Sequence, residues 1–339
     1  MAAQPPQHII ILGAGPCGLA TAISLSKTSS TESPLCITLV ETRPELSTIG
    51  GTIGLTPLAM RYLDQLGVGE VVRERSMPVL HGIDYISSRT GALLGNFWGN
   101  IGAVRIKRHD LVKTLYESLQ MQCSHNVEVQ WGRKVTEISE VHDQIILKFD
   151  DEKGDITGDV LLGCDGLHSA ARRLYVEPSR EKSYTGRVMA MGWGDTNDFE
   201  PDVSSSHSSP ISLASGEPAL TDTTIIRSSE GLLFATYYES TKKKVCFASL
   251  MPMDQPDSES RDGWKTKGKD HEDVREKITG LYSEGKVKGL AEFIDRCESW
   301  ELYPIYILPG EGKWARGRVF LLGEAAHAVS PSSTLQLSY

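Results

Sequence analysis

The chain has 339 residues, enough for two domains or for one large α/β domain with a second layer inserted. Its 40% apolar and 23% charged residues are ordinary for a soluble globular protein, and the net charge of -9 argues against nucleic-acid binding. The six cysteines include no CxxC pair, which predicts buried thiols in a reducing compartment and no metal site. Residues 1–7 lack signal-peptide features and no run is apolar enough for a transmembrane segment, so we expect a cytoplasmic protein.

The chain begins with the pattern of strand, tight turn, helix and strand. His8–Leu12 is a short, unbroken apolar run, as expected of a buried parallel strand. Gly13–Gly18 forms the predicted turn, and Leu19–Ser26 has helical character. Leu35–Val40 is the second predicted strand of this βαβ arrangement.

Further elements follow up to residue 162. Pro57–Leu66 and Asp110–Leu119 are predicted helices, because each carries leucines or tyrosine on one face at spacings of four, and Gly67 ends the first. The predicted strands are Val127–Trp131, Gln144–Phe149 and Val160–Leu162.

The middle of the chain has a different pattern. Pro201–Pro210 is rich in serine and Asp254–Asp273 is dense in charge, so both are predicted to be surface loops. Leu232–Tyr238 and Val245–Leu250 are predicted to pair as a hairpin. The first pattern returns at Arg318–Gly323, which indicates that a sheet-based domain is inserted at about residues 180–300.

The turn Gly13-Ala14-Gly15-Pro16-Cys17-Gly18 has the spacing GxGxxG, directly between a strand and a helix. Gly13 permits the sharp turn, Gly15 lets the backbone approach a pyrophosphate, and Gly18 lets helix and strand pack closely. The phosphates then meet unpaired N–H groups at the positive end of the helix. The alternative is a glycine-rich turn in an unrelated α/β protein.

Glu41 supports the dinucleotide interpretation. It ends the second strand, roughly 20 residues beyond the glycines, where a carboxylate accepts hydrogen bonds from both ribose hydroxyls. A phosphorylated ribose would be repelled there, so the turn favours FAD or NAD over NADP.

Three further segments carry a resemblance to a known family. They are Gly50–Pro57 with Arg108, the stretch Gly163-Cys164-Asp165-Gly166-Leu167-His168-Ser169-Ala170-Ala171-Arg172, and the stretch Arg318–Ala328 with Gly323 and Glu324. Together with the turn, they resemble the class A flavoprotein monooxygenases, the family of para-hydroxybenzoate and salicylate hydroxylases, especially its fungal members. The last segment is similar to the motif that binds the ribityl chain of FAD, so the resemblance implies FAD and not NAD at this site.

The resemblance also implies roles for particular residues. The stretch containing Gly54 passes beside the flavin, and Arg108, at a helix N-terminus where the dipole disfavours a cation, faces the cofactor. Asp165 supports FAD and the passing NAD(P)H, although Asp165 and Gly166 could form only a turn in which Ser169 caps a helix. Position 324 is glutamate where the family has aspartate, which puts the ribityl contact in doubt.

The substrate residues are predicted less directly. Many members have an arginine shortly after a Tyr-Thr-Gly stretch, but this chain has methionine there, and Arg187 lies four residues away. Arg187 and Tyr237 are the candidate catalytic residues, and Tyr238 is an alternative for steering a phenolic substrate. An aromatic side chain on a strand is more often a packing residue.

The implied fold is an α/β protein, with a Rossmann-like, glutathione-reductase-type FAD-binding domain of three layers and an inserted, mainly antiparallel substrate domain. The predicted FAD-binding domain comprises residues 1–180 and a return segment, 304–339, and the substrate domain comprises residues 181–303. The implied reaction uses NAD(P)H and O2 to hydroxylate an aromatic or polyketide-like small molecule through a flavin hydroperoxide. The alternatives are epoxidation, Baeyer–Villiger insertion, or reduction of a double bond without O2.

The last residues depart from the family pattern. After Pro331 the family continues with a Gly-Gln-Gly turn and a long helix, whereas here eight residues, Ser332–Tyr339, follow. This departure predicts a shortened protein, and a non-catalytic product with weak FAD binding is the competing interpretation.

Overall fold

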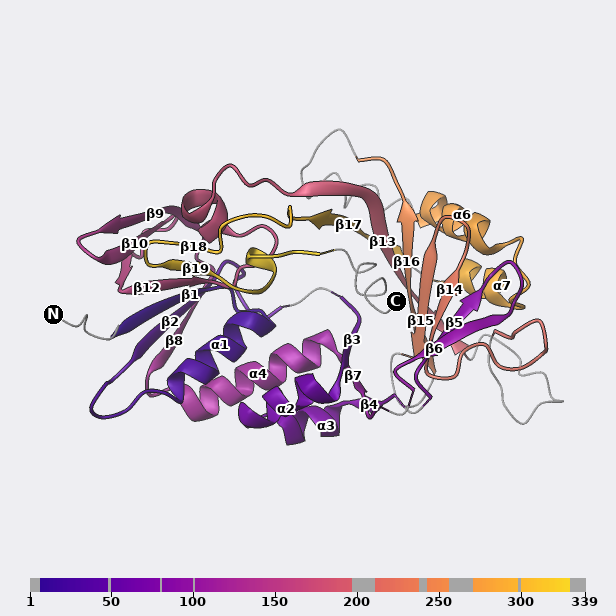
Figure 1. Ribbon diagram of the computed structural model, residues 1–339, viewed down its shortest axis with the longest axis horizontal. Coiled ribbons are helices and arrows are strands. Elements are labelled where there is room, and N and C mark those ends of the chain that lie inside the picture. The colour runs from indigo at the N-terminus through magenta and orange to yellow at the C-terminus, as the bar shows by residue number, and fades with distance from the viewer. Residues whose placement is uncertain are drawn as a thin grey trace.

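The computed structural model describes residues 7–47, 50–79, 81–99, 101–196, 211–237, 243–255, 271–297 and 300–329. Two lobes lie side by side along the long axis of the molecule, and each is built on a large sheet (Figure 1). We call them the parallel-sheet lobe and the antiparallel-sheet lobe, after the strand directions given below.

The parallel-sheet lobe has a six-stranded sheet at its centre. In spatial order its strands are β18 (Ala315–Arg316), β19 (Val319–Leu321), β12 (Val160–Gly163), β1 (His8–Leu12), β2 (Cys36–Glu41) and β8 (Val127–Trp131). All neighbours are parallel except β18 and β19. The apolar run of β1 is buried because both faces of this sheet are covered.

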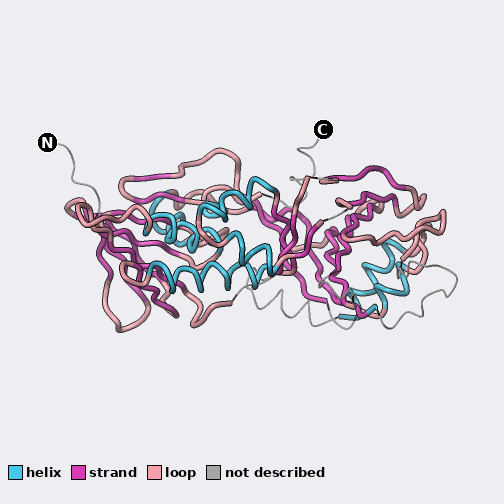
Figure 2. Tube along the Cα trace, turned by 90° about the horizontal axis from the view of Figure 1, so that it is seen from below, coloured by secondary structure: helices cyan, strands magenta, loops and turns pink. Residues whose placement is uncertain are grey.

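Helices cover one face of this sheet, and a small antiparallel sheet covers the other. The helices are α1 (Pro16–Ser26), α2 (Pro57–Gln65), α3 (Gly69–Arg75) and α4 (Arg108–Cys123), and Figure 2 shows helices grouped separately in each lobe. The covering strands are β9 (Val135–Val141), β10 (Gln144–Phe149) and β11 (Ile156–Gly158), beside the π-helical turn Arg172–Val176. These three layers confirm the predicted type of FAD-binding domain.

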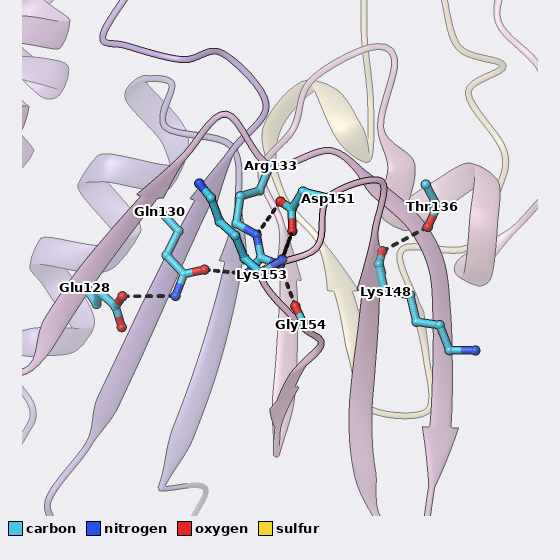
Figure 3. Close-up of polar contacts among 8 residues, drawn as sticks. All are labelled: Glu128, Gln130, Arg133, Thr136, Lys148, Asp151, Lys153 and Gly154. Atoms are coloured by element: carbon cyan, nitrogen blue, oxygen red, sulfur yellow. Dashed lines mark hydrogen bonds and ion pairs between the residues drawn. The ribbon is translucent and has the colours of Figure 1, made fainter.

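A buried arginine fixes the corner between β8 and β9 (Figure 3). Arg133 donates two hydrogen bonds to Asp151, at 2.8 and 2.9 Å, one to Gln130 at 2.7 Å and one to the carbonyl of Gly154. Its guanidinium also lies 3.7 Å from the centre of the Phe149 ring. The buried cation is therefore paired, and it holds the turn after β10 against the end of the central sheet.

The antiparallel-sheet lobe contains a seven-stranded sheet. Its spatial order is β17 (Trp300–Ile307), β13 (Ser183–Asp195), β16 (Lys244–Pro252), β15 (Leu232–Tyr237), β14 (Thr223–Arg227), β5 (Ile83–Ser87) and β6 (Leu93–Phe97). Only β14 and β5 are parallel, so the predicted mainly antiparallel domain is confirmed. Helices α6 (His271–Tyr282) and α7 (Leu290–Asp295) cover one face, over a core that includes Trp300, Phe247 and Phe293.

This sheet extends beyond residues 181–303. Its strands β5 and β6 come from the range 1–180, and β17 continues to Ile307. A small sheet of β3 (Thr52–Leu55), β7 (Val104–Lys107) and β4 (Met77–Pro78) lies between the two lobes (Figure 1). The chain therefore crosses between the lobes several times.

The predicted local elements are found with small shifts at their ends. The predicted hairpin is formed by β15 and β16, and Gly67 has the positive φ of 77° expected after α2. The predicted loop Pro201–Pro210, residues 256–270, Tyr238 and everything from Ser330 onward lie outside the described residues. The interpretation of the chain's last residues therefore stays a prediction.

Candidate functional site

Four loops meet at one edge of the parallel sheet. Strands β1, β2, β12 and β19 run in the same direction and are neighbours, so the loops after Leu12, Glu41, Gly163 and Leu321 emerge together. This carboxyl edge is where open α/β sheets bind ligands. The predicted cofactor-binding residues other than Gly54 and Arg108 lie in these loops or, in the case of Glu41, at the end of β2.

The first and third glycines of the turn are required by packing. A β-carbon on Gly13, whose φ is +98°, would lie 2.6 Å from the carbonyl oxygen of Cys164. A β-carbon on Gly18 would overlap the carbonyl oxygen of Gly13. These contacts hold the turn tightly against the loop after β12.

Gly15 is different, because no contact among the described residues requires a glycine there. Its backbone is extended, and a β-carbon at this position would have no neighbouring atom of the described residues within 4 Å. Gly15 is the N-cap of α1, Pro16 follows it, and no side chain caps the helix. The space before Gly15 and the first N–H groups of α1 together suit an anion that approaches the backbone closely.

Glu41 is oriented toward this turn. One carboxylate oxygen accepts a hydrogen bond from the N–H of Ala14 at 2.8 Å, and the other accepts one from the N–H of Arg43 at 2.9 Å. The carboxylate is thus fixed at the mouth of the loop, where an acidic residue binds ribose hydroxyls in dinucleotide-binding folds.

Asp165 presents a carboxylate with one unsatisfied oxygen. Its Oδ2 atom accepts hydrogen bonds from the N–H groups of Ala170 and Ala171, at 2.6 and 3.3 Å. Its Oδ1 atom is buried and has no hydrogen-bond partner among the described residues. Burial raises the pKa of Asp165 above its ordinary value, which marks a carboxyl group that a bound polar ligand would satisfy.

Arg172 connects two of the motifs, a role that the sequence did not predict. The side chain is 1% exposed, and it donates to the carbonyl of Ala325 at 2.9 Å and to that of Leu167 at 2.6 Å. The loops after β12 and β19 are therefore held together by one cation. The spacing between Asp165 and this arginine was the available signal.

Gly323 and Glu324 lie against the dinucleotide turn. Gly323 has a φ of +58°, and a β-carbon there would lie 3.2 Å from the sulfur of Cys17. Glu324 is exposed, and its Oε2 atom lies 3.9 Å from the position of a β-carbon on Gly166. The longer acidic side chain at position 324 thus reaches the loop that contains Asp165.

Arg108 contacts the glycine loop, Gly50 and Gly51, that precedes β3. It begins α4, its N–H donates to the carbonyl of Gly51 at 2.9 Å, and its Cδ atom lies 3.4 Å from a β-carbon position on Gly50. A β-carbon on Gly51 would in turn lie 3.0 Å from Met191 and 3.2 Å from Cys246. The loop therefore joins the parallel-sheet lobe to β13 and β16.

Gly54 faces a tryptophan. A β-carbon there would lie 2.6 Å from the indole of Trp98, a residue with the unusual φ of +61°. The structure thus accounts for Gly54 through its contact with Trp98. No sequence pattern pointed to this tryptophan.

Arg105 is a further residue that no sequence pattern indicated. It is 5% exposed, lies next to Gly54 in the small sheet, and donates to the carbonyl of Asp222 at 3.0 Å and to the hydroxyl of Thr223 at 2.5 Å. Its Nε atom is buried and has no hydrogen-bond partner among the described residues, and the charge of the Asp222 carboxylate acts on the guanidinium. Burial lowers its pKa from the ordinary value.

Tyr237 and Arg187 are not brought to the four loops. Tyr237 is buried in the core between the seven-stranded sheet and α6 and α7. Arg187 donates a hydrogen bond to the carbonyl of Glu230 at 2.9 Å, at the turn between β14 and β15. Both residues lie where packing and turn contacts account for them.

The described ranges contain no candidate metal-ion site and no helix that could span a membrane. No group of three or more histidine, cysteine, aspartate or glutamate residues could hold a metal ion there. None of the helices described is long and apolar enough to cross a membrane.

Comparison with known families shows the family of the chain. Residues 7–335 match the family described as FAD binding domain, so the chain belongs to that family. It is a class A flavoprotein monooxygenase, and FAD is the cofactor of this class. The open space at Gly15, the oriented Glu41 and the unsatisfied Asp165 oxygen fit such a cofactor.

Curated relatives cover nearly the whole chain. The chain is 26% identical over 329 residues to 3-hydroxybenzoate 6-hydroxylase of Klebsiella oxytoca, an alignment that covers 95% of the chain and 74% of the relative. It is 25% identical over 342 residues to salicylate hydroxylase of Pseudomonas putida, with 97% and 73% covered. A solved salicylate hydroxylase substrate complex matches with a TM-score of 0.74 at 18% identity, covering 97% of this chain and 75% of that one, which shows a shared fold.

Proposed function

We propose that this enzyme hydroxylates an aromatic or polyketide-like small molecule in the cytoplasm, with NAD(P)H as reductant and O2 as oxidant. In the balanced reaction, Ar–H, O2, NAD(P)H and H⁺ give Ar–OH, NAD(P)⁺ and H2O. FAD, when bound, supplies the activation of O2, while the protein binds, orients and shields the substrate.

The contact between Gly51 and the seven-stranded sheet carries this proposal. Along β13 and β16, Val188, Ala190 and Phe247 point into the core below α6 and α7. Met191 and Cys246 point to the opposite face and meet Gly51. One face of the large sheet is thereby turned toward the cofactor loops, an arrangement suited to holding a substrate beside FAD.

The names of the relatives support a phenolic substrate. Salicylate and 3-hydroxybenzoate are aromatic acids with an electron-rich ring, which is the kind of carbon that accepts an electrophilic oxygen atom. Arg105 supports an acidic or phenolic group, because it is a buried cation whose Nε atom has no hydrogen-bond partner among the described residues, and it lies beside the same interface. An anionic substrate group beside Arg105 would offset the free-energy cost of removing the guanidinium from water.

The test uses purified protein saturated with FAD. Hydroxybenzoates and larger phenols are screened for stimulation of NADH or NADPH oxidation, with O2 uptake and product mass measured together. The proposal predicts one oxygen atom added per NAD(P)H oxidised. A ring-expanded or epoxide product would favour the alternative oxygenations, and NAD(P)H oxidation with substrate reduction and no O2 uptake would establish a reductase.

A matched pair of variants locates the substrate face. Met191→Arg introduces a long cation beside Gly51 and should abolish substrate stimulation, whereas Arg187→Met, at the distant turn, should leave it within about twofold. Equal losses in the two variants would contradict this placement of the substrate.

A further inference from the structure

One edge of a buried guanidinium group is not matched by a strong acceptor of the described residues. Arg105 lies on β7, in the small sheet between the two lobes, and its Nη1 atom donates to the carbonyl of Asp222 at 3.0 Å and to the hydroxyl of Thr223 at 2.5 Å. Its Nε atom is buried and has no hydrogen-bond partner among the described residues. Its Nη2 atom contacts the sulfur of Met77 at 3.9 Å, and a thioether is a weak acceptor.

The Nε and Nη2 edge has the geometry that binds a carboxylate. Its N–H groups are parallel, so they bind both oxygens of a carboxylate in a bidentate pair, whereas a neutral amide or hydroxyl brings no charge. The side chain of Arg105 is 5% exposed, and an anion offsets the free-energy cost of burying its charge. Met77 carries a flexible side chain, which can move aside when a ligand reaches this edge.

The register of the large sheet connects Arg105 to the glycine loop that precedes β3. Thr223, which accepts a hydrogen bond from Arg105, is paired with Thr236, and the two hydroxyls lie 2.8 Å apart. Thr236 is in turn paired with Cys246, and directly opposed side chains on neighbouring strands point to the same face. Cys246 meets Gly51. Arg105 therefore lies at one end of a row of side chains that reaches this loop.

Trp98 lies on the same face of the small sheet as Arg105. Gly54 and Arg105 are directly opposed on β3 and β7, so a β-carbon on Gly54 would point to the face that carries Arg105. That β-carbon would lie 2.6 Å from the six-membered ring of Trp98. The half-buried Trp98 has a φ of +61°, a conformation that costs free energy for a bulky residue and is found most often at functional sites.

We propose that Arg105 and Trp98 select an aromatic carboxylate as the substrate. Arg105 binds the carboxylate through its Nε and Nη2 edge, and the indole of Trp98 packs against the aromatic ring, which extends along the row of side chains toward Gly51. The role of the bound acid as a substrate rests on the proposed function, whereas its binding does not require turnover.

The first experiment measures binding and not turnover. The FAD-saturated full-length protein is titrated by calorimetry at pH 7 with salicylate, 3-hydroxybenzoate and a hydroxynaphthoate, and with the primary amide of each acid, which keeps the shape and removes the charge. We expect at least one acid to bind wild type about thirtyfold or more tightly than its amide, because the amide leaves a buried cation unpaired. A panel in which no acid binds more tightly than its amide would overturn the proposal.

Substitution of Arg105 tests the source of this preference. In Arg105→Gln the acid and its amide should bind within about threefold of each other, because the charge and the paired donors are both removed. Arg105→Lys keeps the charge of the buried site but not the paired donors, and its preference should be weaker than that of wild type. Arg227→Gln is the matched control, because it removes an exposed arginine from β14, the strand of Thr223, and it should keep the wild-type preference. An unchanged preference in both Arg105 variants would contradict the assignment.

Substitution of Trp98 should have a different signature. Trp98→Ala should weaken the acid and its amide equally, by about tenfold, because ring packing does not depend on the charge of the ligand. Trp98→Phe keeps an aromatic ring and should retain most of the affinity. Unchanged affinities in Trp98→Ala would show that the indole does not contact the ring.

Binding and hydroxylation can fail separately. If an acid shows the expected preference and loses it in Arg105→Gln, but no phenol is hydroxylated, the proposed function fails and the recognition by Arg105 stands. If neutral phenols are hydroxylated as efficiently as acids, and Arg105→Gln leaves this selectivity unchanged, the recognition fails and the proposed function stands.

Discussion

At the scale of single residues, the three glycines of the turn act for different reasons. The protein's own packing requires glycine at positions 13 and 18, because β-carbons on Gly13 and Gly18 would overlap backbone atoms. Gly15 has open space before it among the described residues, which supports the proposal that its missing side chain serves a ligand. A structural glycine and a binding glycine can therefore be distinguished by substitution.

Gly15→Ala should leave the free energy of unfolding of the FAD-free protein within about 0.5 kcal/mol of wild type, since its backbone is extended and its surroundings are open. FAD affinity should fall about tenfold, or about 1.4 kcal/mol. Gly18→Ala, the matched control, should cost about 1–3 kcal/mol of stability. Urea denaturation and FAD titration measure both, and equal stabilities in the two variants would contradict this distinction.

Asp165→Asn tests the unsatisfied carboxylate. Because burial raises the pKa of Asp165, its charged form disfavours the folded state, and wild-type stability should fall as the pH rises above about 3.9 through the folded pKa. The variant lacks this titration, so its stability relative to wild type should increase from pH 4 to pH 7. FAD-free protein is used for denaturation at both pH values.

The same variant should bind FAD more weakly, because the oxygen left free in the protein is replaced by an amide nitrogen. The difference in free energy of unfolding between Asp165→Asn and wild type is compared at pH 4 and pH 7. An equal difference at both pH values would show that burial does not destabilise the charged Asp165 carboxylate.

At the scale of elements, the Arg133 corner joins β8 to the covering sheet (Figure 3). The hydrogen bond from Arg133 lowers the pKa of Asp151, so the stabilisation is present above the ordinary aspartate pKa and is lost as the pH falls through the lower folded pKa. Removing the carboxylate also leaves the buried guanidinium without its ion pair.

Asp151→Asn should therefore reduce the free energy of unfolding at pH 7, and the difference from wild type should shrink when the pH falls below about 4. The control is Glu137→Gln, which breaks the exposed ion pair between Lys148 and Glu137 on neighbouring strands and should change stability by less than about 1 kcal/mol. An Asp151→Asn effect as small as that of the control would contradict the role of this corner.

Elements with strong local signals could be predicted from the sequence. The first strand, the glycine turn and the hairpin of β15 and β16 have apolar runs and turn residues that depend on near neighbours alone. The motifs in the four loops of the cofactor site could be predicted from local signals, and the loops lie together because neighbouring parallel strands have their carboxyl ends at the same edge of the sheet.

Other features depend on contacts that are distant in sequence. Strand β5 pairs with β14, about 140 residues later, and nothing in residues 83–87 indicates this partner. The face on which Tyr237 lies is set by the alternation along β15, and only the position of α6 and α7 shows that this face is the core. The contacts of Arg105 and Arg172 likewise arise from packing between segments far apart.

At the scale of the whole molecule, the two lobes are joined by β3, β7 and β4 and by the contact of Gly51 with Met191 and Cys246. The loops after β1, β2, β12 and β19 therefore lie at the boundary between the parallel-sheet lobe and the antiparallel-sheet lobe, and the second lobe is the one that we propose to face the substrate. Because FAD binds the folded chain, FAD at 100 times its Kd should stabilise the protein by about 2.7 kcal/mol, measurable as a rise in Tm.

Isotope labelling tests the proposed hydroxylation most directly. The FAD-saturated protein is incubated under isotopically heavy O2 with NADH or NADPH and a panel of hydroxybenzoates and related phenols, and the products are analysed by mass spectrometry. We expect one heavy oxygen atom on the ring of the hydroxylated product, with one NAD(P)H oxidised for each product formed. A fully FAD-loaded protein that yields no labelled product from any member of the panel, with either nucleotide, would contradict the proposed aromatic hydroxylation.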